Sequence, residues 1–390
     1  MTPLRRTRVM VVTDALSVGG AERVAVDIAN TLDEEQFDVR FCSTRIDGPL
    51  RARIADHIPV TILGRSATWD IAKMFAFAQQ VRSEGIDLIH SHGRGTLKFV
   101  ALMQALGLID VRHVYHDHFG WLHVDRGADA GLRVALRTQV DAFIGVDSRL
   151  CEWATTIAGV EAERVHLVRS GVDMHRFDDV VPVDLRSSLD IPDDALILAM
   201  VANFRPPKDH PTLFRAIAEL PVDLRERLRL VIIGATTSDP LYVENCVAMM
   251  ERLGIAHLVH CIGEQEDVPG MLAAADIAVL SSKNETGPLV ILEYMAAALP
   301  FIATDTGEIA AAVRDLGVGL VPPPRDHYAV ADAVAELLRM SDEERSEMGD
   351  RGRAVAESRF SQVRVTAQVE EIYRGVLSLG IPRPVVVTSA

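Results

Sequence analysis

The sequence predicts an α/β protein of two domains, each built on a parallel β-sheet that is covered by helices. The chain has 390 residues, which exceeds the usual size of one domain. Hydrophobic residues make up 48% of it and aromatic residues only 5%, so its cores must be mainly aliphatic, as in the central strands of parallel sheets. Strand-like and helix-like segments also alternate along the chain, which indicates parallel strands joined by right-handed crossovers.

The first domain is predicted over residues 1–176. Its first strand is RVMVVT at 8–13, and a segment with helical periodicity follows at 21–32, where the apolar residues share one face. Further strands, separated by helices, are expected at 37–42, 59–63, 86–91, 111–116, 141–146 and 164–168.

The alternation breaks at 171–194, where Asp, Pro and Ser accumulate, and we place the interdomain linker there. A second series of strands starts at 196–201 and continues through RLVIIG, HLVHCIG, DIAVLSS and PFIAT, which defines a second domain over 177–359. An amphipathic helix is expected at 359–379. It either caps the second domain or crosses back to the first, and we assign the helix at 360–380 to the first domain.

Charge and cysteine content exclude several classes of protein. The net charge of −15 divides into −3 for residues 1–180 and −12 for the remainder, so no dense basic stripe is available for nucleic acid. The four cysteines lie far apart, without a C-x-x-C pair, which fits a reducing compartment better than disulfides or a zinc site. No segment is long and apolar enough to span a membrane. We therefore expect a cytoplasmic protein, with peripheral contact to the inner face of the membrane left open.

The stretch SSKNETGPLVILEYMAAALPFIAT is the most informative part of the sequence. A strand runs into a loop, and a helix is expected to begin near Pro288, because proline is favoured in a first helical turn. The helix terminus at Gly287, Pro288 and Leu289 would present free N–H groups and a positive dipole end to a phosphate. Glu285 precedes this terminus and Glu293 follows eight residues later. One carboxylate can reach the group beyond the phosphates, and the other can accept hydrogen bonds from a ribose diol.

This stretch resembles the E-x-x-x-x-x-x-x-E region of the retaining family 4 glycosyltransferases, which have the GT-B fold. Glu285 and Glu293 match the two glutamates of that region. The resemblance implies two Rossmann-like domains that face each other across a central cleft. It also implies that Glu285 holds hydroxyls of the transferred sugar and that Glu293 holds the ribose.

Other segments resemble the same family in the same order. SVGGAERVAVDIANTL is similar to its first glycine loop, which implies that Gly19 and Gly20 let the backbone approach donor and acceptor. DLIHSHGRGTLKF resembles its D-x-x-H-x-H-x strand end. RSGVDMHRF resembles its N-G-V-D-x-x-x-F linker, with Ser170 in place of the usual Asn. The tail RFSQVRVTAQVEEIYRGVL resembles its crossover helix, so the resemblance covers nearly the whole chain.

VANFRPPKDHPTLFRAIAEL resembles the family segment that supplies an arginine and a lysine to the donor diphosphate. Lys208 matches the lysine. Asn203 stands where many members have the arginine, and we expect Arg205, two residues further on, to take over its role. Both Asn203 and Arg205 are therefore candidate donor-binding residues.

Histidines are frequent at two predicted strand ends, in HSHG and VYHDHFGWLH. We expect the two histidines of HSHG, like those of the second segment, to project to alternate faces, so that no pair converges on one metal ion. The chain also lacks the D-x-D motif common in metal-dependent glycosyltransferases. No metal is therefore predicted. His118 matches the family histidine that faces the transferred sugar, and His116 is the alternative.

The predicted function is transfer of a sugar from a nucleoside diphosphate sugar to an acceptor hydroxyl, without a metal or other cofactor. The resemblance implies retention of anomeric configuration and a UDP- or GDP-linked donor as co-substrate. The acceptor would be a glycan or a lipid-linked glycan in polysaccharide or glycolipid biosynthesis. Two alternatives remain open, a nucleotide-sugar epimerase of the same fold and a non-catalytic nucleotide-binding subunit.

A basic segment in the first domain suggests where a lipid-linked acceptor would be met. Arg133 and Arg137 are four residues apart on a predicted helix, with Leu132, Val134 and Leu136 nearby, and Arg126 precedes it. A basic, partly apolar face can dock on anionic lipid. The alternative is an ordinary solvated helix face.

Overall fold

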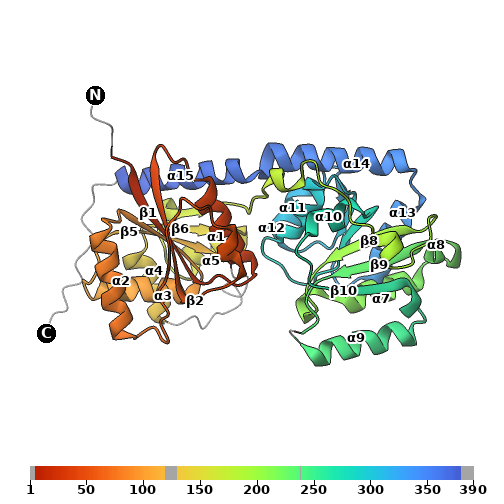
Figure 1. Ribbon diagram of the computed structural model, residues 1–390, viewed down its shortest axis with the longest axis horizontal. Coiled ribbons are helices and arrows are strands. Elements are labelled where there is room, and N and C mark those ends of the chain that lie inside the picture. Colours follow the sequence, from red (N-terminus) through yellow and green to blue (C-terminus); the bar gives the residue numbers. More distant parts are fainter. Residues whose placement is uncertain (1–4, 119–129, 238, 379–390) are drawn as a thin grey trace. The chain divides into compact units, whose positions relative to one another are not determined.

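The computed structural model describes residues 5–118, 130–237 and 239–378 and divides the chain into two compact units. Unit 1 is Met1–Gly171 together with Gln362–Ala390, and unit 2 is Val172–Ser361. The chain thus enters unit 2 at Val172, within the predicted linker and five residues before the expected start of the second domain at 177. It returns to unit 1 at Gln362. Figure 1 shows that each unit is a β-sheet with helices on both faces.

The sheet of unit 1 is parallel throughout, with seven strands among the described residues in the order β3-β2-β1-β4-β5-β6-β7. All of its strands overlap those predicted from the sequence. They are β1 (Thr7–Ala15), β2 (Phe37–Ile46), β3 (Val60–Ile62), β4 (Leu88–His92), β5 (Arg112–Asp117), β6 (Ala142–Gly145) and β7 (Val165–Leu167).

Helices connect these strands and bury their apolar faces on the sheet. Met10 and Val12 of β1 lie in a core with Phe77 and Phe99, whose rings meet edge to edge with centroids 5.3 Å apart. Two of the helices begin at an aspartate that accepts a hydrogen bond from the first helical turn, Asp70 and Asp147. The helices of unit 1 are α1 (Gly20–Thr31), α2 (Ile71–Ser83), α3 (Arg94–Ala105), α4 (Ala130–Gln139), α5 (Ser148–Thr156) and α15 (Gln362–Ser378).

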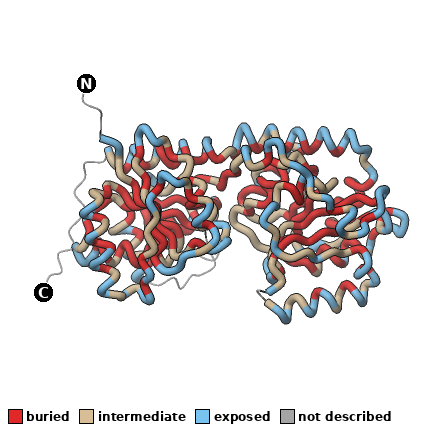
Figure 2. Tube along the Cα trace, in the orientation of Figure 1, coloured by how far each residue is buried: buried red, intermediate tan, exposed pale blue. Residues whose placement is uncertain are grey.

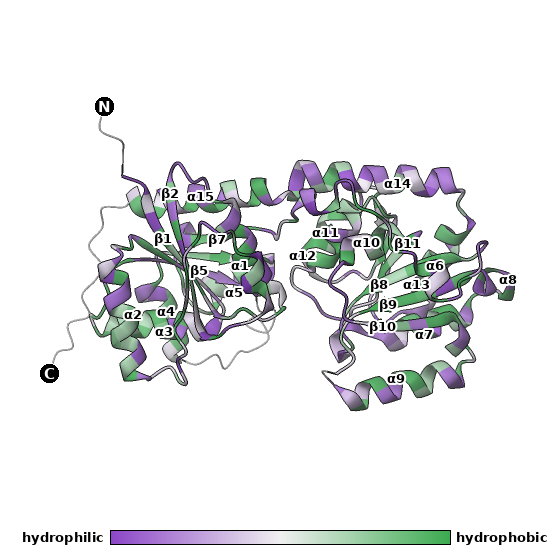
Figure 3. Cartoon of the chain, in the orientation of Figure 1, coloured by the Kyte–Doolittle hydropathy of each residue, from purple (hydrophilic) through white to green (hydrophobic). Residues whose placement is uncertain are grey.

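The sheet of unit 2 is also parallel, with the order β10-β9-β8-β11-β12-β13. The two-residue strand β13 was not predicted, because so short a segment has no measurable periodicity. Figure 3 shows hydrophobic green on β8 and β9, as expected for strands covered on both faces. The strands are β8 (Leu196–Val201), β9 (Leu228–Ile233), β10 (Val259–Gly263), β11 (Ile277–Leu280), β12 (Phe301–Ala303) and β13 (Gly319–Leu320).

The helices of unit 2 enclose two main aliphatic cores, one centred on Leu198 and Ile232 and the other on Ile291 and Phe301. Figure 2 shows the strands as the buried centre and the outer helices as partly exposed. These helices are α6 (Leu185–Ser188), α7 (His210–Glu219), α8 (Val222–Glu226), α9 (Pro240–Arg252), α10 (Val268–Ala273), α11 (Leu289–Ala296), α12 (Gly307–Val313), α13 (His327–Arg339) and α14 (Asp342–Val355).

Helix α15 belongs to unit 1 by its contacts. The hydroxyls of Thr31 on α1 and Thr366 on α15 are 2.6 Å apart, and the backbone N–H of Asp33 donates to Glu370 at 2.9 Å. A π-helical turn at Ala356–Phe360 ends the preceding helical segment. The helix therefore begins at Gln362, three residues later than the sequence indicates.

Both sheets have the strand order of a doubly wound Rossmann fold, as predicted. In such sheets the connections leave in opposite directions from a switch point, where a crevice opens beyond the carboxyl ends of the strands. The switch point lies between β1 and β4 in unit 1 and between β8 and β11 in unit 2. The predicted site residues follow these strands or their neighbour β5.

Candidate active site

In unit 2, the two loops at the switch point carry an ion pair between predicted site residues. Lys208 ends the short helix η4 (Pro206–Lys208), which follows β8, and Glu285 lies in the loop after β11. The Lys208 Nζ atom is 2.6 Å from Oε1 of Glu285, and the Ser282 hydroxyl donates to the same oxygen at 2.7 Å. The side chains of Lys208 and Glu285 are 26% and 15% exposed. The sequence placed both residues at the donor, and the fold brings them into contact.

Backbone contacts hold these two loops together. The N–H of Lys283 donates to the carbonyl of Pro207 at 2.9 Å. The hydroxyl of Ser281 donates to the carbonyls of Lys208 and Asp209, at 3.1 and 3.2 Å. Asp209 itself has left-handed backbone torsions, with φ 51°. The positions of Lys208 and Glu285 are therefore fixed by the fold rather than by their own ion pair alone.

A third segment supports the loop after β11 from the other side. The N–H of Glu308 donates to the carbonyl of Thr286 at 2.7 Å, and the hydroxyl of Thr304 donates to the carbonyl of Ser282 at 2.5 Å. Gly307 makes this approach possible. Its φ is +78°, and a Cβ atom there would lie 2.6 Å from the Thr286 carbonyl oxygen. The loop therefore needs glycine at 307.

Helix α11 begins at Leu289, with Pro288 as its N-cap, one residue later than predicted. Pro288 has no side-chain donor or acceptor, so no side chain of the N-cap satisfies the first N–H groups of the helix. These groups, next to Gly287, are the candidate phosphate site. Glu293 lies one turn further along α11 and is buried. Its Oε1 accepts from Arg176 at 3.4 Å.

Arg176 is a residue that sequence reasoning missed. It lies in η3 (Met174–Phe177), within the segment that resembles the family linker. Its guanidinium also lies 5.7 Å from the ring centroid of Phe177. The only sequence signal was its place in that motif, since nothing in the sequence shows that the linker packs on α11.

The structure gives Asn203 and Arg205 different surroundings. The Asn203 side-chain oxygen accepts from the N–H of Ala235 at 2.8 Å, which ties the loop after β8 to the loop after β9. The two loops also approach closely at Gly234, next to Ala235. A Cβ atom at Gly234 would lie 2.2 Å from the carbonyl oxygen of Ala202. Arg205 is exposed at the start of η4. Its charge is thus accessible to an anion, as the sequence analysis expects, whereas the Asn203 oxygen already has a structural partner.

In unit 1, four histidines gather at the carboxyl ends of β4 and β5. The ring centroids of His90 and His92 are 4.3 Å apart, and those of His116 and His118 are also 4.3 Å apart. The expectation that each pair projects to alternate faces is wrong. Successive residues of a strand alternate, so residues two apart share a face. The pairing of His92 with His116 in the β4–β5 register then brings the two pairs together.

Burial lowers the pKa of all four imidazoles. Burial lowers the pKa of His90 and of His118 to about 3, and it holds the pKa of His92 and of His116 well below the usual value. The Tyr373 hydroxyl lies 2.6 Å from Nδ1 of His90, and Nδ1 of His92 lies 3.0 Å from Nε2 of His118.

Several ring nitrogens in this cluster lack a partner. Among residues 5–118, 130–237 and 239–378, no hydrogen-bond partner is found for Nε2 of His90, Nε2 of His92 or either ring nitrogen of His116. A buried polar group without a partner costs about 1–3 kcal/mol. Because these histidines also share a face, the expectation that they cannot converge on one metal ion does not hold.

The glycine loop after β1 leads directly into α1. Gly19 is the N-cap with an extended backbone, and Gly20 is the first helical residue. A Cβ at Gly19 would meet only the end of the Glu22 side chain, at 2.2 Å from its Oε2. Burial raises the pKa of Glu22, and the nearby Asp14 adds to the effect. The position is thus at the switch point of unit 1, and its glycine is not required by backbone strain.

The proposed basic face on α4 is less apolar than expected. Leu132 and Leu136 are buried in the core of unit 1, so they are not available to a lipid surface. Val134 is 47% exposed, next to the half-buried Arg133 and the exposed Arg137. Arg126 lies outside the described residues. In the part of the chain that the structure describes, no helix has the length and apolar character needed to cross a membrane.

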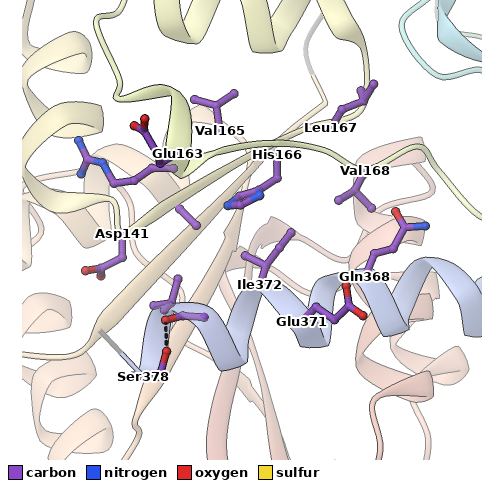
Figure 4. Close-up of a pocket in the computed structure, with 14 residues that line it drawn as sticks. Asp141, Glu163, Val165, His166, Leu167, Val168, Gln368, Glu371, Ile372 and Ser378 are labelled. Atoms are coloured by element: carbon purple, nitrogen blue, oxygen red, sulfur yellow. Dashed lines mark hydrogen bonds between the residues drawn. The ribbon is translucent and has the colours of Figure 1, made fainter. Parts of the chain in front are cut away.

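An open pocket of about 660 Å³ lies within unit 1, between β7 and the C-terminal half of α15. Figure 4 shows Asp141, Glu163, His166 and Glu371 around it. None of the residues predicted to bind donor or acceptor lines this pocket. The candidate site residues therefore lie at the carboxyl ends of the strands and not in this pocket.

Comparisons with protein families and known proteins agree with this arrangement. A family model described as glycosyltransferase family 4 matches residues 18–176, and one described as glycosyl transferases group 1 matches residues 184–355. N-acetyl-α-D-glucosaminyl L-malate synthase of Bacillus anthracis is 24% identical over 376 residues, which covers 93% of this chain and 95% of that protein. D-inositol 3-phosphate glycosyltransferase 2 of Catenulispora acidiphila is 33% identical over 264 residues, 65% of this chain. The chain spans 57% of the length of that protein and about half the length of the other inositol 3-phosphate glycosyltransferases that it matches.

Solved structures show the same fold. HepE of Anabaena in complex with UDP-glucose has a TM-score of 0.79 and 20% identity, with 95% of this chain and all of that chain covered. Sucrose-phosphate synthase of Thermosynechococcus elongatus has a TM-score of 0.76 and 19% identity, with 95% and 99% covered.

Proposed function

Because the chain belongs to the family 4 glycosyltransferases, which have the GT-B fold of two Rossmann-like domains, we propose that it transfers a sugar from a nucleoside diphosphate sugar to an acceptor hydroxyl. The observation that carries the proposal is the contact of Lys208 with Glu285 at the switch point of unit 2. A cation for phosphate and a carboxylate for sugar hydroxyls are thereby held side by side, next to the N-terminus of α11.

Unit 2 is the proposed donor-binding domain. In this proposal, Lys208, Arg205 and the N-terminus of α11 at Gly287, Pro288 and Leu289 bind the diphosphate, and Glu293 accepts hydrogen bonds from the ribose. The buried carboxylate of Glu293, oriented by Arg176, suits that role. HepE was solved with UDP and with UDP-glucose, which supports a UDP-linked sugar as the first donor to test, with a GDP-linked sugar as the alternative.

The chemical task is to break the bond between the anomeric carbon and the diphosphate oxygen. Negative charge grows on the leaving diphosphate, and fixed cations and N–H dipoles stabilise such charge because they need no reorganisation. Lys208 and Arg205 would supply this stabilisation without a divalent ion, and the activated donor makes any other cofactor unnecessary. We propose retention, with the acceptor hydroxyl attacking on the face that the leaving phosphate vacates and passing its proton to that phosphate.

The sugar and acceptor contacts rest on the family resemblance. Glu285 is proposed to hold hydroxyls of the transferred sugar once Lys208 turns to the diphosphate. His118 is proposed to donate or accept a hydrogen bond to that sugar as a neutral imidazole, with His116 as the alternative. Gly19 and Gly20 are proposed to let substrate approach the backbone of unit 1, the acceptor domain.

The acceptor is proposed to be a glycan or a lipid-linked glycan of polysaccharide or glycolipid biosynthesis. Two relatives are named for inositol 3-phosphate and for malate, so small anionic acceptors belong in the same test. Contact of Arg133 and Arg137 with anionic lipid stays part of the proposal. Because Leu132 and Leu136 are buried, this contact would be mainly electrostatic, weak and sensitive to salt.

The experiment is a donor and acceptor screen with the full chain in the presence of EDTA. UDP-glucose, UDP-N-acetylglucosamine and GDP-mannose are each incubated with inositol 3-phosphate, malate and a lipid-linked glycan, and products are identified by mass spectrometry. Transfer with unchanged anomeric configuration in EDTA is the expected result.

Two outcomes would replace the proposal. A changed donor sugar without transfer would indicate an epimerase. Tight nucleotide binding, with neither transfer nor donor hydrolysis to any acceptor or water, would indicate a non-catalytic nucleotide-binding subunit.

A further inference from the structure

The histidine cluster of unit 1 contains three residues that could together hold a metal ion, and the proposed reaction assigns a role to only one of them, His116, as the alternative to His118. His90 and His92 on β4 and His116 on β5 are fully buried, and one nitrogen from each lies within 4.8 Å of those from the other two. Tetrahedral zinc with bonds of about 2.1 Å holds its ligand nitrogens about 3.4 Å apart. Small rotations of the three rings would close the remaining separation.

Each of the three histidines has at least one ring nitrogen that could bind a metal ion without breaking a hydrogen bond among the described residues. Nδ1 of His90 is occupied by Tyr373 and Nδ1 of His92 by His118, so Nε2 of each ring is the atom left over. His116 has both nitrogens open, within the described residues. Metal-bound histidines commonly use one nitrogen for the ion and the other for such an outer partner.

The chemistry of the set selects the kind of ion. All the ligand atoms of this set are imidazole nitrogens of buried histidines. Neutral imidazole suits late first-row transition metals, whereas Mg²⁺ and Ca²⁺ need oxygen ligands.

We propose that His90, His92 and His116 form a binding site for Zn²⁺ in unit 1, with Tyr373 and His118 orienting the ligand rings. Three protein ligands leave a fourth position for water or another small ligand. The proposed transfer needs no metal and is assayed in EDTA, whereas metal binding is measured without donor or acceptor, so failure of either proposal can be told from failure of the other.

The test measures metal binding by the full chain without donor or acceptor. Protein stripped with a chelator is titrated with Zn²⁺ against a competing indicator, and with Co²⁺ as a spectroscopic probe. The expected result is one Zn²⁺ per chain and an intense visible absorption of the Co²⁺ form, typical of tetrahedral coordination. X-ray absorption at the zinc edge should show three imidazole nitrogens.

The variants locate the site. His116→Phe keeps a flat aromatic ring and removes both nitrogens without breaking a hydrogen bond among the described residues, so a folded variant should lose the stoichiometric ion. Tyr373→Phe removes the outer partner of His90 and should weaken Zn²⁺ binding about tenfold or more. His166→Ala, a histidine of the same sheet that lies outside the cluster, is the matched control and should bind as the wild type does.

Three results would overturn the proposal. One is a wild-type chain that binds no stoichiometric Zn²⁺. Another is unchanged binding by folded His116→Phe, which would place the ion on other histidines. The third, which needs no variant at all, is fewer than three imidazole ligands in the X-ray absorption of the wild-type complex.

Discussion

At the residue scale, Glu285 forms an ion pair with Lys208, the cation that is proposed to bind the donor diphosphate. Its carboxylate lies 2.6 Å from Lys208 Nζ. If Lys208 binds the diphosphate as proposed, the diphosphate competes with this carboxylate for the ammonium group. The ion pair of Arg176 with Glu293 is longer, at 3.4 Å, and involves a more buried carboxylate, whose side chain is 4% exposed.

Replacement of Glu285 by Gln should therefore separate binding of the nucleotide from transfer. The variant frees Lys208, so UDP should bind up to about fivefold more tightly, since a partly exposed ion pair is worth up to about 1 kcal/mol. Turnover should fall, because the sugar loses its acceptor. Calorimetric titration with UDP and a transfer assay check both effects. Weaker UDP binding by a folded Glu285→Gln variant would contradict the competition.

Lys208→Ala should lower turnover as well as donor affinity. The charge on the diphosphate grows as the bond breaks, so a missing cation affects the transition state more than the ground state, and a loss of about a hundredfold in kcat is expected. Lys283→Ala, on the neighbouring loop, is the matched control and should behave as the wild type. An unchanged kcat with a raised KM would remove Lys208 from the chemical step.

Glu293→Ala should weaken donor binding by roughly 1.5–3 kcal/mol, because a ribose diol would lose a charged acceptor. The truncation also leaves Arg176 without this carboxylate, so Arg176→Met is measured beside it to separate loss of the acceptor from loss of the ion pair. Calorimetry with UDP checks the result in variants whose circular dichroism is native. Equal affinity in Glu293→Ala and wild type would exclude the ribose role.

At the element scale, the loop between β11 and α11 is held by three neighbouring segments. The helix η4 contacts it through Pro207, Thr304 after β12 donates to Ser282, and the first turn of α12 donates to Thr286. The loop thus gains its conformation from tertiary hydrogen bonds rather than from its own sequence. Such support keeps Glu285 and the N-terminus of α11 in place before a ligand arrives.

Gly307→Ala tests that support. The new Cβ would lie 2.6 Å from the carbonyl oxygen of Thr286, at a φ of +78°. Gly317→Ala is the matched control, since Gly317 also has a positive φ, +63°, but nothing lies within 4 Å of its Cβ. Backbone strain of about 1–2 kcal/mol is common to both, so Gly307→Ala should lose more stability in urea unfolding and also bind UDP more weakly. Equal losses in both variants would show that the contact with Thr286 is unimportant.

At the scale of the whole molecule, each unit carries its own set of proposed substrate-binding residues. Unit 1 presents histidines and a glycine loop, and unit 2 presents cations, glutamates and a helix terminus. Although acidic residues are concentrated after residue 180, the two cations proposed for the diphosphate, Lys208 and Arg205, lie together after one strand of that half.

Hydrogen exchange with UDP should show this division. A ligand at a hundred times its Kd adds about 2.7 kcal/mol to the stability of the state that binds it. Protection is expected in 203–209 and 281–293 of unit 2, with the amides of β9 and β10 changed much less. The full chain with and without UDP is compared by mass spectrometry. Protection confined to unit 1 would show that the nucleotide binds unit 1, which would contradict the proposed donor site in unit 2.

The sequence alone determined every strand of the two sheets except the two-residue β13, and it also supplied the residues proposed for the donor. Strand and helix periodicities are local, so aliphatic runs such as LILAMV predict their strands without knowledge of the fold. The glutamates flanking Pro288 are also local, since strand, loop and helix follow one another along the chain. Leu132 and Leu136 were misjudged as surface residues, because the helical spacing does not reveal which face meets the core.

The tertiary structure decided which side chains meet. Lys208 and Glu285 are 77 residues apart, and only the adjacency of β8 and β11 brings them together. Arg176 reaches Glu293 because the linker packs on α11. The histidine cluster depends on the register that pairs His92 with His116. Pairing across strands is set by how whole sheets bury their apolar faces, a property of the assembled fold that local sequence patterns do not contain.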